Sequence, residues 1–141
     1  MRTVYKVRAL VTDQPGGALA IEADAEHVLQ LPGGSRKAKE PRRAALRREL
    51  WEELGHTVRI HRKAATVEVQ RNGVREVTDF YLVQVKGGHG QPSLTGRELA
   101  RGLRVTRYES AKALRKELQR RVRKFGRSAA ARDLHLVCQA V

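Results

Sequence analysis

Polar and apolar residues alternate near the start of the chain in the way that predicts a β-hairpin. The alternation covers residues 4–12, and a second apolar run covers residues 18–23. Residues 13–17, D-Q-P-G-G, separate the two runs and have the composition of a tight turn. A third, shorter strand is expected over residues 27–31. It is followed by the loop P-G-G, where the backbone can approach a ligand closely.

The next segment has the apolar spacing of an amphipathic helix. We expect Pro41 at the first helical position, the last turn at about Leu54, and Gly55 as the residue that ends the helix. The stripe predicted to face the core consists of Ala45, Leu46, Leu50 and Leu54.

A second hairpin is expected in the middle of the chain. Strands over residues 57–69 and 74–85 flank an Asn-Gly pair, which is typical of a two-residue hairpin turn. A glycine-rich loop is expected over residues 86–96, and a short strand over residues 103–105.

Two helices are expected at the C-terminal end. Ser110 is predicted to cap a helix that ends near Phe125, and a last helix is expected from Ser128 to Val141. The order of elements is rich in strands, with one helix inserted and two appended. This order favours an α+β fold over a regular alternation of strands and helices.

Composition is that of one globular domain over residues 1–141. The chain is 40% hydrophobic and 31% charged, and no apolar run is long enough to cross a bilayer. The first residues read as a strand, without the apolar segment of a signal peptide. Cys138 is the single cysteine, so no disulfide within the chain can form, and we expect it to pack in the last helix. A cytoplasmic protein is therefore expected.

Charge changes this picture, because the net charge is +14 and is unevenly distributed. Thirteen lysines and arginines lie between residues 97 and 132, against three glutamates. A basic surface attracts polyanionic ligands. The alternative, a generally basic protein with a solvated face, is equally consistent with the composition.

Three glutamates carry the clearest chemical signal. Glu49, Glu52 and Glu53 have the spacing that places them on one face of the predicted helix. Three like charges destabilise a helix unless something neutralises them, and a hard divalent cation with oxygen ligands does so. The pattern predicts a metal site suited to phosphate chemistry.

The segment over residues 34–56 resembles the Nudix hydrolase signature, G-x5-E-x7-R-E-U-x-E-E-x-G-U, where U is a bulky aliphatic residue. The positions that match are Gly34, Glu40, Arg48, Glu49, Leu50, Glu52, Glu53 and Gly55. The last position departs from the signature, since it is His56. The resemblance implies an α/β/α sandwich with a mixed sheet, in which a loop-helix-loop element carries the signature.

The resemblance also implies a reaction, the hydrolysis of a nucleoside diphosphate linked to another moiety. Glu49, Glu52 and Glu53, with the carbonyl of Gly33, are then the implied ligands of Mg²⁺, for which Mn²⁺ is a substitute. Four residues are implied to support the loop and the glutamates, namely Gly34, Glu40, Arg48 and Gly55.

A carboxylate near a cation-activated water is expected to accept its proton. Glu52 is one candidate base. Glu98 is another, because similar proteins often place an extra glutamate in that region; the alternative is an ordinary surface charge.

Cations next to the glycines indicate a highly charged substrate. Arg36, Lys37 and Lys39 lie where phosphates are expected, although they fit solvated loop charges equally well. Candidate substrates are a nucleoside triphosphate, a dinucleoside polyphosphate, an ADP-ribose-like compound, a diphosphoinositol polyphosphate and the 5′ end of an RNA.

The alternative function is a non-catalytic module that binds polyanions or RNA on the same scaffold. A basic helix over residues 110–125 supports contact with nucleic acid, but no RNA-binding motif accompanies it. No membrane partner is expected. A homodimer is possible, because dimers are common among similar proteins.

Overall fold

A mixed β-sheet forms the centre of the computed structural model, which describes residues 1–23, 28–94, 99, 102–126 and 129–140. Its strands are β1 (Arg2–Thr12), β2 (Ala18–Ala23), β3 (Val28–Gln30), β4 (Gly33–Ser35), β5 (His56–Arg71), β6 (Val74–Gly88) and β7 (Leu103–Tyr108). The strand order is β3-β2-β1-β6-β5, with β4 paired to β1 and β7 paired to β2. β1 and β6 run parallel, and the other pairs are antiparallel.

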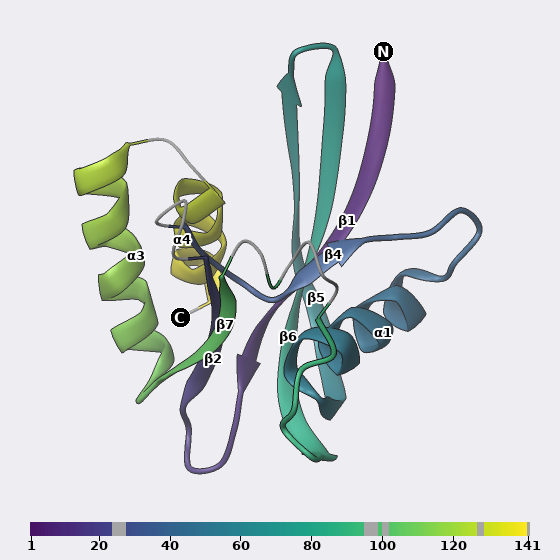
Figure 1. Cartoon of the computed structure of the whole chain (residues 1–141). Helices are drawn as coiled ribbons and strands as arrows, with labels where there is room; N and C mark the ends of the chain where they lie inside the picture. The colour runs from purple at the N-terminus through teal and green to yellow at the C-terminus, as the bar shows by residue number, and fades with distance from the viewer. Residues whose placement is uncertain (24–27, 95–98, 100–101, 127–128, 141) are drawn as a thin grey trace.

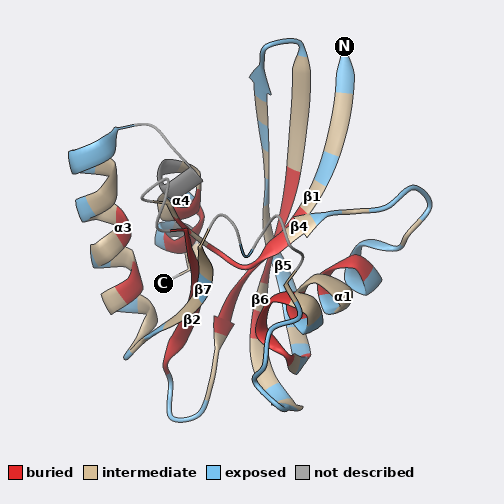
Figure 2. Ribbon diagram, in the orientation of Figure 1, coloured by how far each residue is buried: buried red, intermediate tan, exposed pale blue. Residues whose placement is uncertain are grey.

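Helices cover both faces of this sheet (Figure 1). They are α1 (Arg42–Leu54), α3 (Ala111–Phe125) and α4 (Ala129–Ala140). α1 lies on one face, while α3 and α4 lie together on the other. Buried positions concentrate where the sheet meets the helices, and the far ends of β5 and β6 are much more exposed (Figure 2). The chain is therefore an α+β sandwich, as the order of predicted elements indicated.

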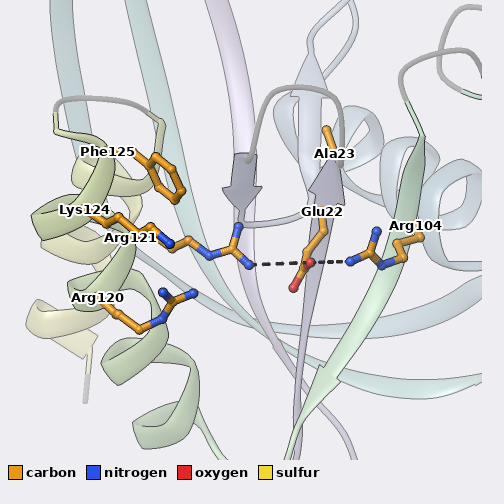
Figure 3. A pocket seen from close by; sticks show the side chains of 7 residues that line it. All are labelled: Glu22, Ala23, Arg104, Arg120, Arg121, Lys124 and Phe125. Carbon is orange, nitrogen blue, oxygen red and sulfur yellow. Dashed lines mark hydrogen bonds and ion pairs between the residues drawn. The ribbon is translucent and has the colours of Figure 1, made fainter.

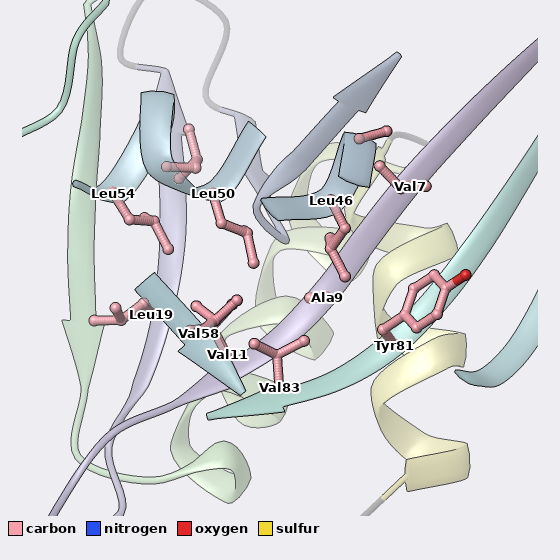
Figure 4. Close-up of a cluster of buried hydrophobic side chains, with 12 residues drawn as sticks. Val7, Ala9, Val11, Leu19, Leu46, Leu50, Leu54, Val58, Tyr81 and Val83 are labelled. Atoms are coloured by element: carbon pink, nitrogen blue, oxygen red, sulfur yellow. The ribbon is translucent and has the colours of Figure 1, made fainter. Parts of the chain in front are cut away.

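Two hydrophobic clusters fill the two interfaces, because successive side chains of a strand point to opposite faces. In β1, Val7 and Val11 belong to the cluster under α1, and Leu10 belongs to the cluster under α3 and α4. The cluster under α1 (Figure 4) consists of Val7, Ala9, Val11, Leu19, Ile21, Ala45, Leu46, Leu50, Leu54, Val58, Tyr81 and Val83. All four residues of the predicted helix stripe are buried in it.

The predicted hairpin turns are confirmed. β1 and β2 pair antiparallel across residues 13–17, with Val11 opposite Leu19. Asn72 and Gly73 both have positive φ, 51° and 75°, which is the conformation that a two-residue turn between β5 and β6 requires.

Four local predictions need correction. The glycine pair expected in a loop after Leu31 instead belongs to strand β4, Gly33–Ser35, because it pairs with β1. Pro41 is not the first helical residue but the N-cap, because its ψ of 144° is extended and its carbonyl accepts the first helical bond, from Ala45. The expected loop over residues 86–96 starts later, since β6 continues to Gly88 by pairing with His56. β7 extends beyond residue 105 to Tyr108, because it pairs with β2 along that strand's whole length.

Where they are described, the C-terminal helices agree with the sequence pattern, with one exception. The predicted ends of the last helix, Ser128 and Val141, lie outside the described residues. Ser110 caps α3 by accepting a hydrogen bond from Ala113 N at 3.0 Å, and Leu114 and Leu118 are fully buried. In α4, Leu136 and Val137 face the core, whereas Cys138 is exposed instead of packed. The exception follows from helical geometry, because Cys138 lies beyond the edge of the narrow buried stripe.

Within the described part of the chain, no helix combines the length and the apolar character needed to cross a membrane.

We expect Ser110→Ala to lower the free energy of unfolding by about 1 kcal/mol, because the Ala113 N–H loses its cap. Ser110→Asp keeps an acceptor oxygen at this position and should retain most of the stability. Urea denaturation of the three proteins measures the difference. Equal losses in both variants would show that the cap contributes nothing.

Candidate functional site

Arg48 joins the carboxylates of three glutamates, Glu40, Glu49 and Glu52. Its Nε and Nη2 donate to the two oxygens of Glu40, at 2.9 and 3.0 Å. Its Nη1 donates to Glu49 at 3.0 Å and to Glu52 at 3.4 Å. Nη2 also donates to the carbonyl of Ser35 at 3.1 Å. One guanidinium thus ties the loop before α1 to the acidic face of the helix.

Glu40 is held in its charged form by this pairing. The hydrogen bond from Arg48, followed by the backbone N–H of Lys37, lowers the pKa of Glu40 from 4.5 to about 2. The same carboxylate raises the pKa of Arg48 above its ordinary value. The Glu40–Arg48 pair therefore stays ionised at any physiological pH, which suits the supporting role that the sequence predicted.

Glu53 is the most deeply placed of the three glutamates, with 6% of its surface exposed. Its Oε1 accepts a hydrogen bond from Gly33 N at 2.7 Å. Gly33 lies where β4 pairs with β1, and a Cβ there would overlap the carbonyl oxygen of Val7. Its φ of 148° also favours glycine. The sheet thus fixes Gly33, and Gly33 fixes Glu53.

Gly34 gives Glu49 its place. A Cβ on Gly34 would lie 2.5 Å from the carboxyl carbon of Glu49. That distance is shorter than any normal contact, so a side chain here would displace the carboxylate. The two glycines therefore position two different glutamates. Gly33 holds Glu53 through a hydrogen bond, and Gly34 leaves the space that the Glu49 carboxylate occupies.

Glu52 lies at the outer edge of the site, with 46% of its side chain exposed. Its backbone carbonyl accepts a hydrogen bond from Ser93 N at 2.7 Å, and the carbonyl of Gly55 accepts one from Gly90 N at 3.0 Å. The segment after β6 therefore packs on the C-terminal end of α1. Gly55, with φ of 69°, ends the helix in the left-handed conformation that was predicted.

Two aromatic residues border this end of the helix. Trp51, 41% exposed, meets the ring of His89 edge-on, with centroids 4.8 Å apart. His56, which replaces the aliphatic residue of the signature, has Nδ1 3.1 Å from the carbonyl oxygen of Gly87. A polar contact between strands thus takes the place of the aliphatic one.

The atoms available to coordinate a metal at this site are of the type that a hard divalent cation prefers. All are oxygens, from the carboxylates of Glu49, Glu52 and Glu53 and from the backbone beside them, and such ions prefer oxygen ligands. Among the residues that the structure describes, no three His, Cys, Asp or Glu side chains already lie at metal-binding distances. Glu49 and Glu52 share Arg48 instead.

The other predicted site residues are more scattered. The guanidinium of Arg36 lies over the Tyr5 ring, 4.8 Å from its centroid. Lys37 and Lys39 are exposed on the loop before α1. Glu98, the second candidate base, falls outside the described residues.

Two buried charges behind the glycine loop were not predicted. Arg8 Nη1 donates to the carbonyl of Leu31 at 2.9 Å, and Asp133 accepts from Leu31 N at 2.7 Å. Burial, followed by repulsion from Arg132, lowers the pKa of Arg8. Both residues hold the chain just before Gly33. The signal available in the sequence for Arg8 was a single charge inside the apolar run V-R-A-L-V; Asp133 follows Arg132 at the start of the segment L-H-L-V, where no such isolated charge marks it.

Comparison with known families gives one match. A family model described as NUDIX domain matches residues 2–127, which is most of the chain. Among curated proteins, none matches the sequence.

Solved structures share the fold at low sequence identity. The E. coli ORF135 protein is 20% identical, with a TM-score of 0.70, over 99% of this chain and 89% of its own. A NUDIX hydrolase from Nitrosomonas europaea is 18% identical, with a TM-score of 0.74, over 99% and 88%. An ADP-ribose pyrophosphatase from Streptococcus suis is 19% identical, with a TM-score of 0.59, over 97% and 90%.

The Glu40–Arg48 pair predicts a pH-dependent stability. Since the pKa of Glu40 is lowered in the folded state, its stabilisation is complete above the ordinary value of 4.5 and is lost as the pH falls from 4.5 through 2. We expect the difference in free energy of unfolding between wild type and Glu40→Gln to be constant above about pH 5.5 and to shrink below it. Urea denaturation at several pH values measures this difference.

The exposed Glu109 offers a control, because Glu109→Gln changes the net charge equally away from Arg48. A Glu40→Gln difference that stays constant down to about pH 2.5 would contradict the pairing.

Proposed function

Because the chain belongs to the NUDIX domain family of pyrophosphohydrolases, we propose that it hydrolyses a phosphoanhydride bond of a polyphosphorylated substrate with the help of a divalent cation. One observation carries the proposal. Arg48 and the Gly33–Gly34 pair gather Glu49, Glu52 and Glu53 at one end of α1, where the sheet and the helix meet. Oxygen ligands at one place are what phosphoryl chemistry with Mg²⁺ requires.

Glu49, Glu52, Glu53 and the carbonyl of Gly33 would hold the cation, Mg²⁺ by preference and Mn²⁺ as a substitute. When bound, it would withdraw charge from a pyrophosphate oxygen and make a neighbouring water more acidic.

The protein residues have separate tasks in this proposal. Arg48 orients Glu49 and Glu52 through one nitrogen, and its pairing with Glu40 keeps that nitrogen in place. The buried Glu53 is held by Gly33 N. Glu52, being the most exposed of the three, is the side chain best placed to take a proton from water. Glu98 stays a second candidate for this role.

The substrate is proposed to be strongly anionic. Lys37 and Lys39 are exposed on the loop between the glycine pair and α1, and both are available for phosphate groups. Arg36 would have to leave the Tyr5 ring to join them. The Streptococcus suis protein is an ADP-ribose pyrophosphatase. ADP-ribose is the least charged of the candidate substrates.

Residues 1–141 are proposed to form one domain, since Leu136 and Val137 of α4 share a cluster with Leu114 and Leu118 of α3. That the protein is cytoplasmic and that it forms a homodimer remain predictions from the sequence.

Glu53→Gln should lower kcat by about 100-fold or more, because the variant loses a carboxylate of the proposed site. The Gln carbonyl can still accept from Gly33 N, so the melting temperature should change little. Phosphate release from a panel of nucleotides, dinucleoside polyphosphates and nucleotide sugars, with Mg²⁺, with Mn²⁺ and with EDTA, measures activity. Wild-type turnover in Glu53→Gln would refute the assignment. An inert wild type would favour a non-catalytic module.

Gly34→Ala should reduce activity at least about 10-fold while the free energy of unfolding changes by less than about 1 kcal/mol. The added methyl group meets the carboxyl end of the Glu49 side chain, which is expected to move out of place without disturbing the backbone. Gly33→Ala is the contrasting variant, because its methyl group meets the rigid carbonyl of Val7 at a φ that favours glycine. It should lose about 2 kcal/mol or more of stability. A fully active Gly34→Ala would contradict this placement of Glu49.

A further inference from the structure

A basic pocket of about 430 Å³ lies on the face of the sheet that α3 covers (Figure 3). Its lining residues are Glu22, Ala23, Arg104, Arg120, Arg121, Lys124 and Phe125. They come from β2, β7 and the second half of α3. The volume is within the range of sites for small molecules, but charged groups and not apolar ones dominate the lining.

A buried carboxylate organises this pocket. Glu22, 8% exposed, accepts hydrogen bonds from Tyr108 Oη at 3.0 Å and from Arg104 Nη2 at 2.8 Å. Arg121 Nη2 approaches the same carboxylate from α3, at 3.6 Å. Figure 3 shows the two guanidinium groups on opposite sides of Glu22. Glu22 therefore holds Arg104 and Arg121 at fixed positions in the pocket.

Among the described residues that line the pocket, four are cations, Arg104, Arg120, Arg121 and Lys124, and one is a carboxylate, Glu22. The described ion pairs join Arg104 and Arg121 to Glu22, and Arg120 and Arg121 to Glu117. Glu117 accepts from Arg120 Nε at 2.9 Å and from Arg121 Nε at 3.1 Å. Lys124 Nζ lies 5.4 Å from the centroid of the Phe125 ring. Positive charges gathered in a concave surface attract an anion and gain from its binding.

The pocket shares one lining residue, Arg104, with a small cavity beside Glu53. This narrow cavity has a volume of about 10 Å³, and its other walls include Glu53, Leu94 and Leu103. Arg104 pairs with Glu22 in the β2–β7 ladder, so these two strands separate the pocket from the acidic end of α1. A molecule bound near Glu53 would need to extend past one strand pair to reach the basic pocket.

We propose that this pocket binds phosphate groups of the substrate that lie beyond the bond being cleaved. Guanidinium groups match the geometry of phosphate oxygens, and two of them are already oriented by Glu22. The assignment rests on the proposed hydrolase activity. It narrows the substrate class to molecules with an extended run of phosphates or several phosphates, as distinct from a compound with a single pyrophosphate.

Binding of inorganic tripolyphosphate, measured by titration calorimetry in EDTA, tests the pocket without turnover. Arg120→Gln/Lys124→Gln should weaken binding more than about 10-fold, because it removes charge-assisted contacts at two exposed positions. Lys112→Gln/Arg123→Gln removes the same charges from exposed positions of α3 that do not line the pocket. It should change the affinity less than about twofold. Equal weakening by both pairs, or no weakening by either, would overturn the proposal.

Kinetics then test whether the bound phosphates belong to the substrate. On the longest phosphate chain that the wild-type protein hydrolyses, the pocket variant should raise KM about 10-fold with kcat unchanged. On the shortest, both constants should stay within about twofold. Unchanged KM on the longest chain would overturn the link to the substrate. If the wild-type protein hydrolyses nothing, the proposed function fails, and calorimetry still decides whether the pocket binds phosphate.

Discussion

The guanidinium of Arg48 is the contact on which the rest of the candidate site depends. Glu49, Glu52 and Glu53 lie within one helical turn, and such a group of like charges opposes helix formation unless a cation compensates it. Arg48 supplies part of that compensation from the same helix, and its other donors reach Glu40 and the carbonyl of Ser35. The interaction therefore stabilises the acidic helix and fixes the preceding loop against it.

The glycine pair provides the second constraint, and it comes from the sheet. Pairing of β4 with β1 brings Gly33 so close to Val7 that no side chain fits. The N–H of Gly33 then points to Glu53, and the open space at Gly34 receives Glu49. Arg8 and Asp133 hold Leu31 from the other side, so the loop is supported by β1 and α4 together. Rigid elements on both sides allow short, precise contacts at a site that a flexible loop alone would place poorly.

Opposite charges are segregated across the molecule. The helix α1 with its glutamates lies on one face of the sheet, and the basic second half of α3 lies on the other. Arg104 lines both the basic pocket and the small cavity beside Glu53. A net charge of +14 therefore coexists with a strongly acidic site. A net positive surface attracts an anion towards the molecule.

The sequence by itself determined the signature over residues 34–56, the stripe of α1, the cap at Ser110 and both hairpin turns, because these depend on contacts within a few residues. It also predicted the strands other than β4, but neither β4 nor the ends of β6 and β7, since pairing with distant strands decides those. Only the tertiary structure decided that Glu53 is buried while Glu52 is partly exposed, and that Glu22 joins Arg104 to Arg121. These arrangements bring together residues as far as 99 positions apart in the chain, and no local pattern encodes a distance of that kind.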